Sequence, residues 1–294
     1  MGKFVIGIGE ALWDMLPGGK KLGGAPANFA YHASQFGLEG LAVSAIGHDD
    51  LGEELVGQLE AHGLPYHLAR VAQPTGTVQV SLDAQGVPQY EIKTDVAWDN
   101  IPFDDELHAL AAGCKAVCYG SLAQRSPVSR ATIHAFLEAT PVDCLKVFDI
   151  NLRQNFYTKE VLEEAFRGCD ILKLNDEELV VISRLFDGPG LGLEEKCWHI
   201  YKEYGLKMLI LTCGTDGSYV FYDGGMSYQV TPKVQVADTV GAGDSFTGSF
   251  VASILQGKSV PSAHETAVKV SAFICTQAGA MPVVPDELKA LPRG

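Results

Sequence analysis

The chain contains, at residues 238–246, the stretch Asp238-Thr239-Val240-Gly241-Ala242-Gly243-Asp244-Ser245-Phe246. An alternating segment, Lys233 to Ala237, precedes it and predicts a strand. A helix is predicted after it, because apolar residues follow at helical spacing, namely Phe246, Phe250 and Ile254. A glycine-rich turn between a strand and a helix presents backbone N–H groups at the helix N-terminus, where anions bind. We therefore expect an α/β fold with an anion site at Gly241, Ala242 and Gly243.

Asp244 lies at the same predicted helix N-terminus. The helix dipole favours the charged form of a carboxylate there, and that form can accept a proton. A carboxylate base beside anion donors suits transfer of a phosphoryl group to an alcohol: the base takes the hydroxyl proton and the N–H groups hold the developing negative charge. A simple N-cap role for Asp244 explains the same spacing and stays open at this point.

Glycine is in excess, with 32 of 294 residues against a typical ~7%, and a second cluster lies at Gly23-Gly24. Paired glycines let the backbone approach a ligand closely. Asn28 follows in the first turn of a helix predicted over Ala27–Ser34, where its amide can donate to and accept from the hydroxyls of a polyol. A tight turn with an Asn cap is the alternative.

A third cluster, Thr212-Cys213-Gly214-Thr215-Asp216-Gly217-Ser218, directly follows a predicted strand, Met208–Leu211. A glycine-rich turn at the carboxyl end of a strand can hold phosphates. A simple β-turn before a next strand, Tyr219–Tyr222, fits the spacing equally well.

The rest of the chain alternates short apolar runs with helical patterns. The runs are Phe4–Ile8, Ala116–Tyr119, Leu145–Ile150, Ile171–Leu174 and Met208–Thr212, and the helical patterns lie at about 127–139, 159–167, 176–186 and 194–204. This alternation predicts a doubly wound α/β fold, with a mostly parallel sheet, helices on both faces, and ligands at the carboxyl ends of the strands.

One region departs from this pattern. Thr77 to Asp83 alternates strictly, a turn is predicted at Ala84-Gln85-Gly86, and Tyr90 to Thr94 follows. This is typical of an antiparallel hairpin. We expect one domain over residues 1–294, with a small β lid at about 75–100 and a short contribution to it near 12–20; a plain edge extension of the sheet is the alternative.

Composition excludes several classes of function. The net charge of −14 argues against nucleic acid as a partner. Gly7-x-Gly9 is followed by Leu12 where a dinucleotide-binding fingerprint needs a third small residue, which argues against a dehydrogenase. The chain has no apolar run of membrane-spanning length and no signal peptide pattern, and its seven cysteines are scattered. We expect a cytoplasmic enzyme without a membrane partner.

The segment around Asp244 resembles the C-terminal signature of the PfkB (ribokinase-like) carbohydrate kinases. Gly23-Gly24 with Asn28 is similar to the N-terminal signature of that family, and Asn175-Asp176-Glu177-Glu178 is similar to its Asn-x-x-Glu motif. The resemblance runs from about Gly9 to Pro285. Within the family, bacterial fructokinases are most similar, because of Gly9-Glu10-Ala11-Leu12-Trp13-Asp14 and Phe148-Asp149-Ile150-Asn151-Leu152-Arg153.

The resemblance implies a role for each matching residue. Asp244 is the expected catalytic base, above an anion hole formed by Gly241, Ala242 and Gly243, and Arg153 is expected to contact the substrate or the moving phosphate. The sugar would be held by Asp14, Gly23, Gly24, Asn28, Arg153 and Asp244. ATP and Mg²⁺ would be held by Asn175, Glu178, Thr212, Gly214, Gly217 and Gly243. A monovalent cation such as K⁺ would bind Asp238 and the carbonyl of Val240.

The resemblance also implies a substrate. Ribokinase has a lysine after its paired glycines, where this chain has Ala25, and an asparagine that contacts its sugar where this chain has Leu12. These departures favour fructose, phosphorylated at its 6-hydroxyl, over ribose. The alternatives are a related kinase acting on 2-keto-3-deoxygluconate, ribose or a nucleoside, and a non-catalytic sugar or nucleotide sensor. The resemblance further implies a homodimer that forms through the lid.

Overall fold

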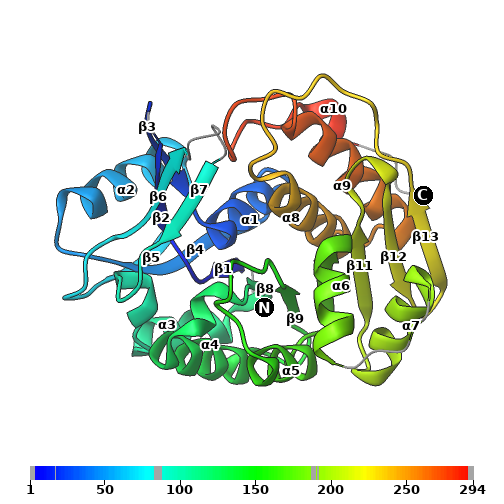
Figure 1. Cartoon of the computed structure of the whole chain (residues 1–294), viewed down its shortest axis with the longest axis horizontal. Helices are drawn as coiled ribbons and strands as arrows, with labels where there is room; N and C mark the ends of the chain where they lie inside the picture. The colour runs from blue at the N-terminus through cyan, green and yellow to red at the C-terminus, as the bar shows by residue number, and fades with distance from the viewer. Residues whose placement is uncertain (1–3, 17, 83–87, 187–189, 191, 291–294) are drawn as a thin grey trace.

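The computed structural model describes residues 4–16, 18–82, 88–186, 190 and 192–290. Over these residues the larger of two sheets has nine strands, in the order β13-β12-β11-β10-β9-β8-β1-β4-β5 (Figure 1). The strands are Phe4–Ile8 (β1), Glu39–Ile46 (β4), Tyr66–Arg70 (β5), Cys114–Tyr119 (β8), Leu145–Asp149 (β9), Ile171–Asn175 (β10), Met208–Thr212 (β11), Ser218–Tyr222 (β12) and Gly225–Gln229 (β13). Neighbouring strands pair parallel except for β11 with β12 and β12 with β13, which pair antiparallel.

Helices cover both faces of this sheet, which confirms the predicted doubly wound α/β architecture. One face carries Asp105–Ala112 (α3), Pro127–Ala139 (α4), Lys159–Gly168 (α5), Asp176–Leu185 (α6) and Leu193–Glu203 (α7). The other face carries Ala25–Ser34 (α1), Asp50–Ala61 (α2), Ala242–Leu255 (α8), Val260–Ile274 (α9) and Asp286–Lys289 (α10). Short 3₁₀ helices lie at Ala97–Asn100, Leu122–Arg125 and Gly214–Asp216. No helix among the described residues is long and apolar enough to cross a membrane.

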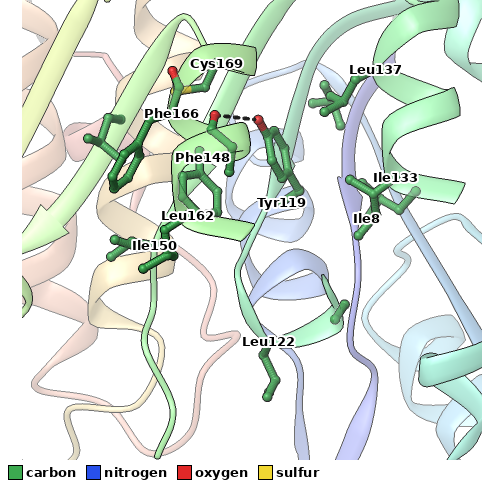
Figure 2. Close-up of a cluster of buried hydrophobic side chains, with 14 of the residues drawn as sticks. Ile8, Tyr119, Leu122, Ile133, Leu137, Phe148, Ile150, Leu162, Phe166 and Cys169 are labelled. Atoms are coloured by element: carbon green, nitrogen blue, oxygen red, sulfur yellow. Dashed lines mark hydrogen bonds between the residues drawn. The ribbon is translucent and has the colours of Figure 1, made fainter. Parts of the chain in front are cut away.

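Two hydrophobic cores follow from the period-two alternation of the buried strands. In β1, Ile6 and Ile8 belong to the core on the α3–α7 side, whereas Val5 belongs to the core beneath α1 and α8. Figure 2 shows part of the first core, where the Tyr119 and Phe148 rings stack at a centroid distance of 5.2 Å. The Tyr119 hydroxyl donates to the Ala165 carbonyl at 3.4 Å, so its one polar atom is satisfied in the core. This packing holds the carboxyl ends of β8 and β9 in place.

The second sheet has four strands in the order β3-β2-β6-β7 and lies at the left of Figure 1. Its strands are Leu12–Leu16 (β2), Gly19–Gly23 (β3), Gly76–Leu82 (β6) and Pro88–Ile92 (β7). We call this sheet the lid sheet. The predicted hairpin supplies β6 and β7, while the turn predicted at residues 84–86 lies outside the described residues.

Two expectations about local structure are wrong. Residues 97–100, predicted as part of the lid, form a buried 3₁₀ helix, because Trp98 is 1% exposed and stacks on the Arg125 guanidinium at 4.0 Å. The segment Lys233–Ala237, predicted as a strand, has no strand partner. Its residues are exposed on both sides, and its Ala237 N–H donates to Cys275 O rather than to a neighbouring strand.

Candidate active site

The candidate site lies at the carboxyl ends of the parallel strands, where the strand order changes direction. From β1 the chain continues to β4 and β5 on one side, and later to β8, β9, β10 and β11 on the other. Such a switch point leaves a crevice outside the strand ends, which is where α/β proteins bind ligands. A small cavity opens there, lined by Glu10, Cys118, Asp149, Asn151 and Asp244 among others.

The N-terminus of α8 presents the predicted anion site. Gly241 is the N-cap with φ +77°, and a Cβ there would lie 2.7 Å from the Ala280 carbonyl oxygen, so both conformation and packing require glycine. The Ala242 N–H donates back to Thr239 O at 3.3 Å, and the first helical bond joins Ser245 N to Gly241 O at 2.8 Å. The N–H groups of residues 243 and 244 precede that bond and have no intrahelical acceptor, so they can donate to an anion.

Asp244 occupies the third position of α8 and is partly buried. Its Oδ2 accepts a 2.7 Å hydrogen bond from Asn28 Nδ2. Burial, helped by the nearby Asp149 carboxylate, raises the pKa of Asp244 to about 6, although Asn28, Lys173 and Arg153 oppose this shift. A carboxylate with this pKa is a competent proton acceptor near neutral pH. The position and environment favour the base role over a simple N-cap, whose place Gly241 takes.

Asn28 is brought to Asp244 by the paired glycines. Gly24 is the N-cap of α1 with φ +130°, and a Cβ there would lie 2.5 Å from the Glu10 carbonyl oxygen. The Asn28 N–H donates to Gly24 O at 3.1 Å, which places its side chain one turn into the helix. The side chain is 3% exposed, and its Oδ1 has no hydrogen-bond partner among the described residues. That oxygen is available to accept a hydroxyl from a ligand.

Asp14 and Arg153 face the site from the lid sheet and from the loop after β9. Asp14 is partly buried in β2, and a Cβ on Gly23 would lie 2.8 Å from its Oδ2. Burial raises the pKa of Asp14, against the positive charges of Arg153 and Lys21. Arg153 is exposed, yet its charge also acts on the pKa values of Glu10 and Asp244. The guanidinium therefore lies within electrostatic reach of the predicted sugar ligands and of the base.

The loop that carries Arg153 has strained backbone. Asn151 and Gln154 have φ values of +43° and +50°, a region that residues other than glycine rarely adopt. Gln154 Nε2 also donates to the Tyr90 carbonyl of β7 at 2.7 Å, which joins this loop to the lid sheet. Strain of this kind is kept where a side chain must be aimed, and Arg153 lies between the two strained residues.

Sequence reasoning gave no role to the buried pair of Asp149 and Lys173. Lys173 Nζ donates to Asp149 Oδ1 at 3.0 Å, and Thr247 Oγ1 donates to Asp149 Oδ2 at 3.1 Å. A Cβ on Gly243 would lie 3.0 Å from Lys173 Nζ, so the ammonium sits directly beneath the anion loop. Burial alone would lower the pKa of Lys173, but the Asp149, Glu178 and Asp244 carboxylates together outweigh it, so the pKa is raised and the ammonium stays charged. A lysine inside the apolar run Ile171–Leu174 was the available signal, since a buried charge needs a partner.

Glu10 was also given no role. It is 5% exposed, and its Oε2 has no hydrogen-bond partner among the described residues. Burial raises the pKa of Glu10 to about 7, assisted by the charge of Asp244 and opposed by its own backbone N–H and Arg153. The site thus holds a second carboxyl group that can carry a proton near neutral pH.

The predicted nucleotide residues gather at the ends of β10 and β11, where Asn175 and Thr212 are register partners. Gly214 and Gly217 follow in the turn after β11 with φ values of +52° and +106°. Asn175 and Glu178 form a capping box at the start of α6: each side chain accepts the other residue's N–H at 2.8 Å.

Magnesium fits this site through water rather than through a protein cage. Among the described residues no group of three or more His, Cys, Asp or Glu side chains could hold a metal ion. The Glu178 oxygens accept the N–H groups of Leu152 and Asn175, both at 2.8 Å, and burial raises the pKa of this carboxyl. Mg²⁺ commonly keeps several waters and binds substrate phosphates, so Glu178 is suited to hold one of those waters.

The predicted monovalent-cation residues have a different environment. Asp238 Oδ1 accepts the Val240 N–H at 3.1 Å, and Oδ2 accepts the Gly279 N–H at 3.3 Å. Oδ2 also pairs with Lys21 Nζ of the lid sheet at 3.2 Å. With Lys21 in this position the carboxylate already has a positive partner, so these residues do not fit an additional monovalent cation.

Comparison with known proteins agrees with this geometry. The profile described as "pfkB family carbohydrate kinase" matches residues 18–287. The chain belongs to the pfkB family. This pfkB kinase is 26% identical over 299 residues to the ATP-dependent 6-phosphofructokinase of Thermoanaerobacterium thermosaccharolyticum, with 96% of this chain and 91% of the relative covered. It is 28% identical over 318 residues to probable fructokinase-3 of Arabidopsis thaliana, with 98% and 90% covered.

A solved structure confirms the fold of this pfkB kinase. The fructokinase of Xylella fastidiosa with bound ATP superposes with a TM-score of 0.83 at 20% identity, covering 99% of this chain and 98% of that one. The protein is therefore an ATP-dependent carbohydrate kinase, as predicted. The roles of the individual site residues stay predictions.

Proposed function

We propose that this kinase transfers the γ-phosphoryl group of ATP to the 6-hydroxyl of fructose. The observation that carries the proposal is the convergence of Asp244, the Asn28 amide and the α8 N-terminus at the strand ends. The first removes a proton, the second positions a hydroxyl, and the third holds negative charge. This is the set of groups that phosphoryl transfer to an alcohol requires.

The side chains of β2 in the lid sheet favour fructose over ribose as the substrate. Leu12, which stands where ribokinase has an asparagine, is 6% exposed and packs in the core with Val78 and Trp98. Position 12 therefore gives no hydrogen bond to a sugar. Asp14, on the same strand, would supply a carboxylate for sugar hydroxyls, and Asn28 Oδ1, which has no partner in the described part of the chain, would supply another acceptor.

The reaction follows from these positions. Asp244 takes the proton of the sugar hydroxyl while the oxygen of that hydroxyl forms a bond to the γ-phosphorus. The bond between the γ-phosphorus and the β–γ bridging oxygen breaks, and ADP leaves with that oxygen. The N–H groups of Gly243 and Asp244 at the N-terminus of α8 hold the charge that builds on the phosphoryl oxygens, because the Ala242 N–H already donates to Thr239 O, and Arg153 approaches from the lid side. Lys173 lies beneath Gly243 and adds a fixed positive charge.

The nucleotide would be bound at the ends of β10 and β11. Thr212, Gly214 and Gly217 would line its site, and Asn175 with Glu178 would orient its phosphates. Mg²⁺, when bound with ATP, supplies neutralisation of phosphate charge. Glu178 would hold a water of that ion.

A substrate panel tests the proposal. The purified protein with ATP and Mg²⁺ is assayed on fructose, fructose 6-phosphate, ribose, 2-keto-3-deoxygluconate and adenosine, and the product position is determined by ³¹P and ¹³C NMR. We expect the highest kcat/KM on fructose and a 6-phosphate product. Negligible kcat/KM on fructose would end this assignment, and phosphate transfer to any acceptor would exclude the sensor alternative.

One observation favours 2-keto-3-deoxygluconate as the second candidate. Arg153 is an exposed guanidinium that acts electrostatically on Asp14, in the region where the sugar would lie. Arginine binds carboxylates in a bidentate manner, and this substrate carries a carboxylate that fructose lacks. A preference for the acid in the panel would support this candidate.

We also infer a cytoplasmic homodimer that forms through the lid sheet. The lid exposes Tyr90, which is an unusual place for a large aromatic side chain on a monomer. All seven cysteines are free in the described structure, which suits a reducing compartment. Light scattering of the wild-type protein and of Tyr90→Ser tests the assembly; a monomeric wild type at micromolar concentration would refute it.

A further inference from the structure

Lys21 connects the lid sheet to the loop that leads into the anion site. Its Nζ lies 3.2 Å from Asp238 Oδ2, across 217 positions of the chain. In the lid sheet Lys21 is the register partner of Asp14, so the two side chains lie on the same face; burial raises the pKa of Asp14, and the ammonium opposes that rise. The ammonium of Lys21 therefore interacts both with Asp14, a predicted sugar ligand, and with Asp238, the first residue of the segment Asp238–Gly241.

Asp238 is the point at which this loop is held. Its two oxygens accept the N–H groups of Val240 and Gly279, and Val240 directly precedes the N-cap of α8. The Asp238 side chain is 19% exposed and the Lys21 side chain is 51% exposed. The ammonium therefore lies on the solvent-facing side of the carboxylate, whereas the backbone N–H groups bind it on the protein side. A second cation placed on the same oxygen would be repelled by the ammonium.

We propose that Lys21 is a built-in cation, which holds Asp238 in the position where a monovalent metal ion would otherwise be needed, so that this kinase works without K⁺. Lys21 acts as a positioning residue, because it touches Asp238 and not the reacting atoms. Lys21 belongs to the lid sheet, which also carries the predicted sugar ligand Asp14. The positive charge that holds Asp238 therefore comes from the same sheet that would face the sugar.

Lys20 provides a matched control. It is the neighbouring residue of the same strand with the same charge, yet it faces the other way, where it pairs with Glu54 of α2 and lies 5.1 Å from the centroid of the Trp13 ring. Removing its charge leaves Asp238 untouched. A nonspecific effect of losing a lid lysine would appear equally in both variants.

The experiment compares wild type, Lys21→Met, Lys21→Arg and Lys20→Met in tetramethylammonium, Na⁺ and K⁺ at constant ionic strength. Two readouts are used: kcat/KM on the best acceptor of the panel, and the Kd for ATP with the Tm of the ATP complex, which need no acceptor. We expect wild type, Lys21→Arg and Lys20→Met to change less than about twofold with the cation. Lys21→Met should lose at least tenfold in tetramethylammonium, and K⁺ should restore most of the activity and raise its Tm saturably.

Three results would overturn the proposal: activation of wild type by K⁺ of tenfold or more, no loss in Lys21→Met, or a loss that K⁺ does not restore. If circular dichroism shows that Lys21→Met is unfolded, the cation dependence of wild type and Lys21→Arg is used instead. Activation of either protein by K⁺ of tenfold or more would then overturn the proposal. The binding and Tm readouts separate this outcome from a wrong sugar assignment, because they do not depend on the acceptor.

Discussion

Asn28 Nδ2 donates a hydrogen bond of 2.7 Å to Asp244 Oδ2, and 216 positions of the chain separate the two residues. Asn28 lies in the first turn of α1 and Asp244 in the first turn of α8, so two helix N-termini meet at one carboxylate. The bond leaves Asp244 Oδ1 outside this contact and leaves the Asn28 oxygen without a partner among the described residues. The pair thus offers a base and a hydroxyl acceptor side by side.

Replacing Asp244 by Asn should remove the base while keeping the fold. General-base catalysis contributes about 10²–10⁴-fold, so we expect kcat to fall by that factor with sugar binding retained. Steady-state kinetics and calorimetric titration of the sugar measure the two effects. Asp143→Asn is the control, since that exposed side chain pairs only with Lys115 in the described structure. An Asp244→Asn variant with undiminished kcat would refute the base role.

The pH dependence of the reaction should show the raised pKa of Asp244. Only the deprotonated carboxylate accepts a proton, so log kcat/KM should fall with unit slope as the pH drops below about 6. Asn28 stabilises the charged form, so Asn28→Ala should move this acid limb to higher pH. The measurement is kcat/KM from pH 5 to 9. A profile that stays flat down to pH 5, as the ordinary pKa of 3.8 would give, or an acid limb unmoved in Asn28→Ala, would contradict the assignment.

Gly241→Ala should damage the anion loop. A Cβ there would lie within 2.9 Å of the Ala280 carbonyl oxygen, Cα and Cβ, on a residue whose φ is +77°. Loss of one oriented donor typically costs 10²–10³-fold in kcat, and we expect a loss of this order with little change in the Kd for the sugar. Gly57→Ala is the control: Gly57 is exposed in α2 with no atom within 4 Å of its added Cβ, so that variant should be active and stabilised by about 0.5–1 kcal/mol. Equal kcat in both variants would argue against the anion loop.

Glu10→Gln should change how stability depends on pH. The folded-state pKa of Glu10 is about 7 against an ordinary value of 4.5, so folding favours its protonated form. Its contribution is fully present below pH 4.5 and is lost as the pH rises to about 7 and beyond, a change of about 3 kcal/mol. Glutamine has no such loss.

Urea denaturation of wild type and Glu10→Gln at pH 5 and pH 8 measures this effect. The free energy of unfolding of the variant, relative to wild type, should be higher at pH 8 than at pH 5 by about 2.5 kcal/mol, because part of the loss has already occurred at pH 5. Glu138→Gln, at an exposed position of α4, should show no comparable difference. Parallel pH profiles for wild type and Glu10→Gln would show that Glu10 is not protonated in the folded state.

Lys173→Met should destabilise the protein by about 3–5 kcal/mol, because Asp149 would remain buried without its partner. The double variant Lys173→Met with Asp149→Leu removes both charges and should recover much of that loss. Urea unfolding at pH 7 measures both. A single variant as stable as wild type would show that the pair does not hold the two strand ends together.

The local elements of this fold were predictable because their signals are local. Apolar runs of four to six residues gave β1, β8, β9, β10 and β11, and the glycine turns with periodic apolar residues gave the starts of α1 and α8. The segment Lys233–Ala237 shows where such reasoning fails: alternation predicts a strand, but a strand needs a partner, and the large sheet ends elsewhere at β13 and β5.

The sequence by itself determined the family, the α/β class and the identity of Asp244, Asn28, Asn175 and Glu178 as site candidates, since each belongs to a short motif whose chemistry needs those residue types at that spacing. Only the tertiary structure decided which groups share one electrostatic environment. Glu10 comes from the loop after β1 and Asp149 and Lys173 come from β9 and β10, while Lys21 reaches Asp238 from a separate sheet. Charge–charge energies depend on distance and burial in space, and neither quantity can be read from positions along a chain.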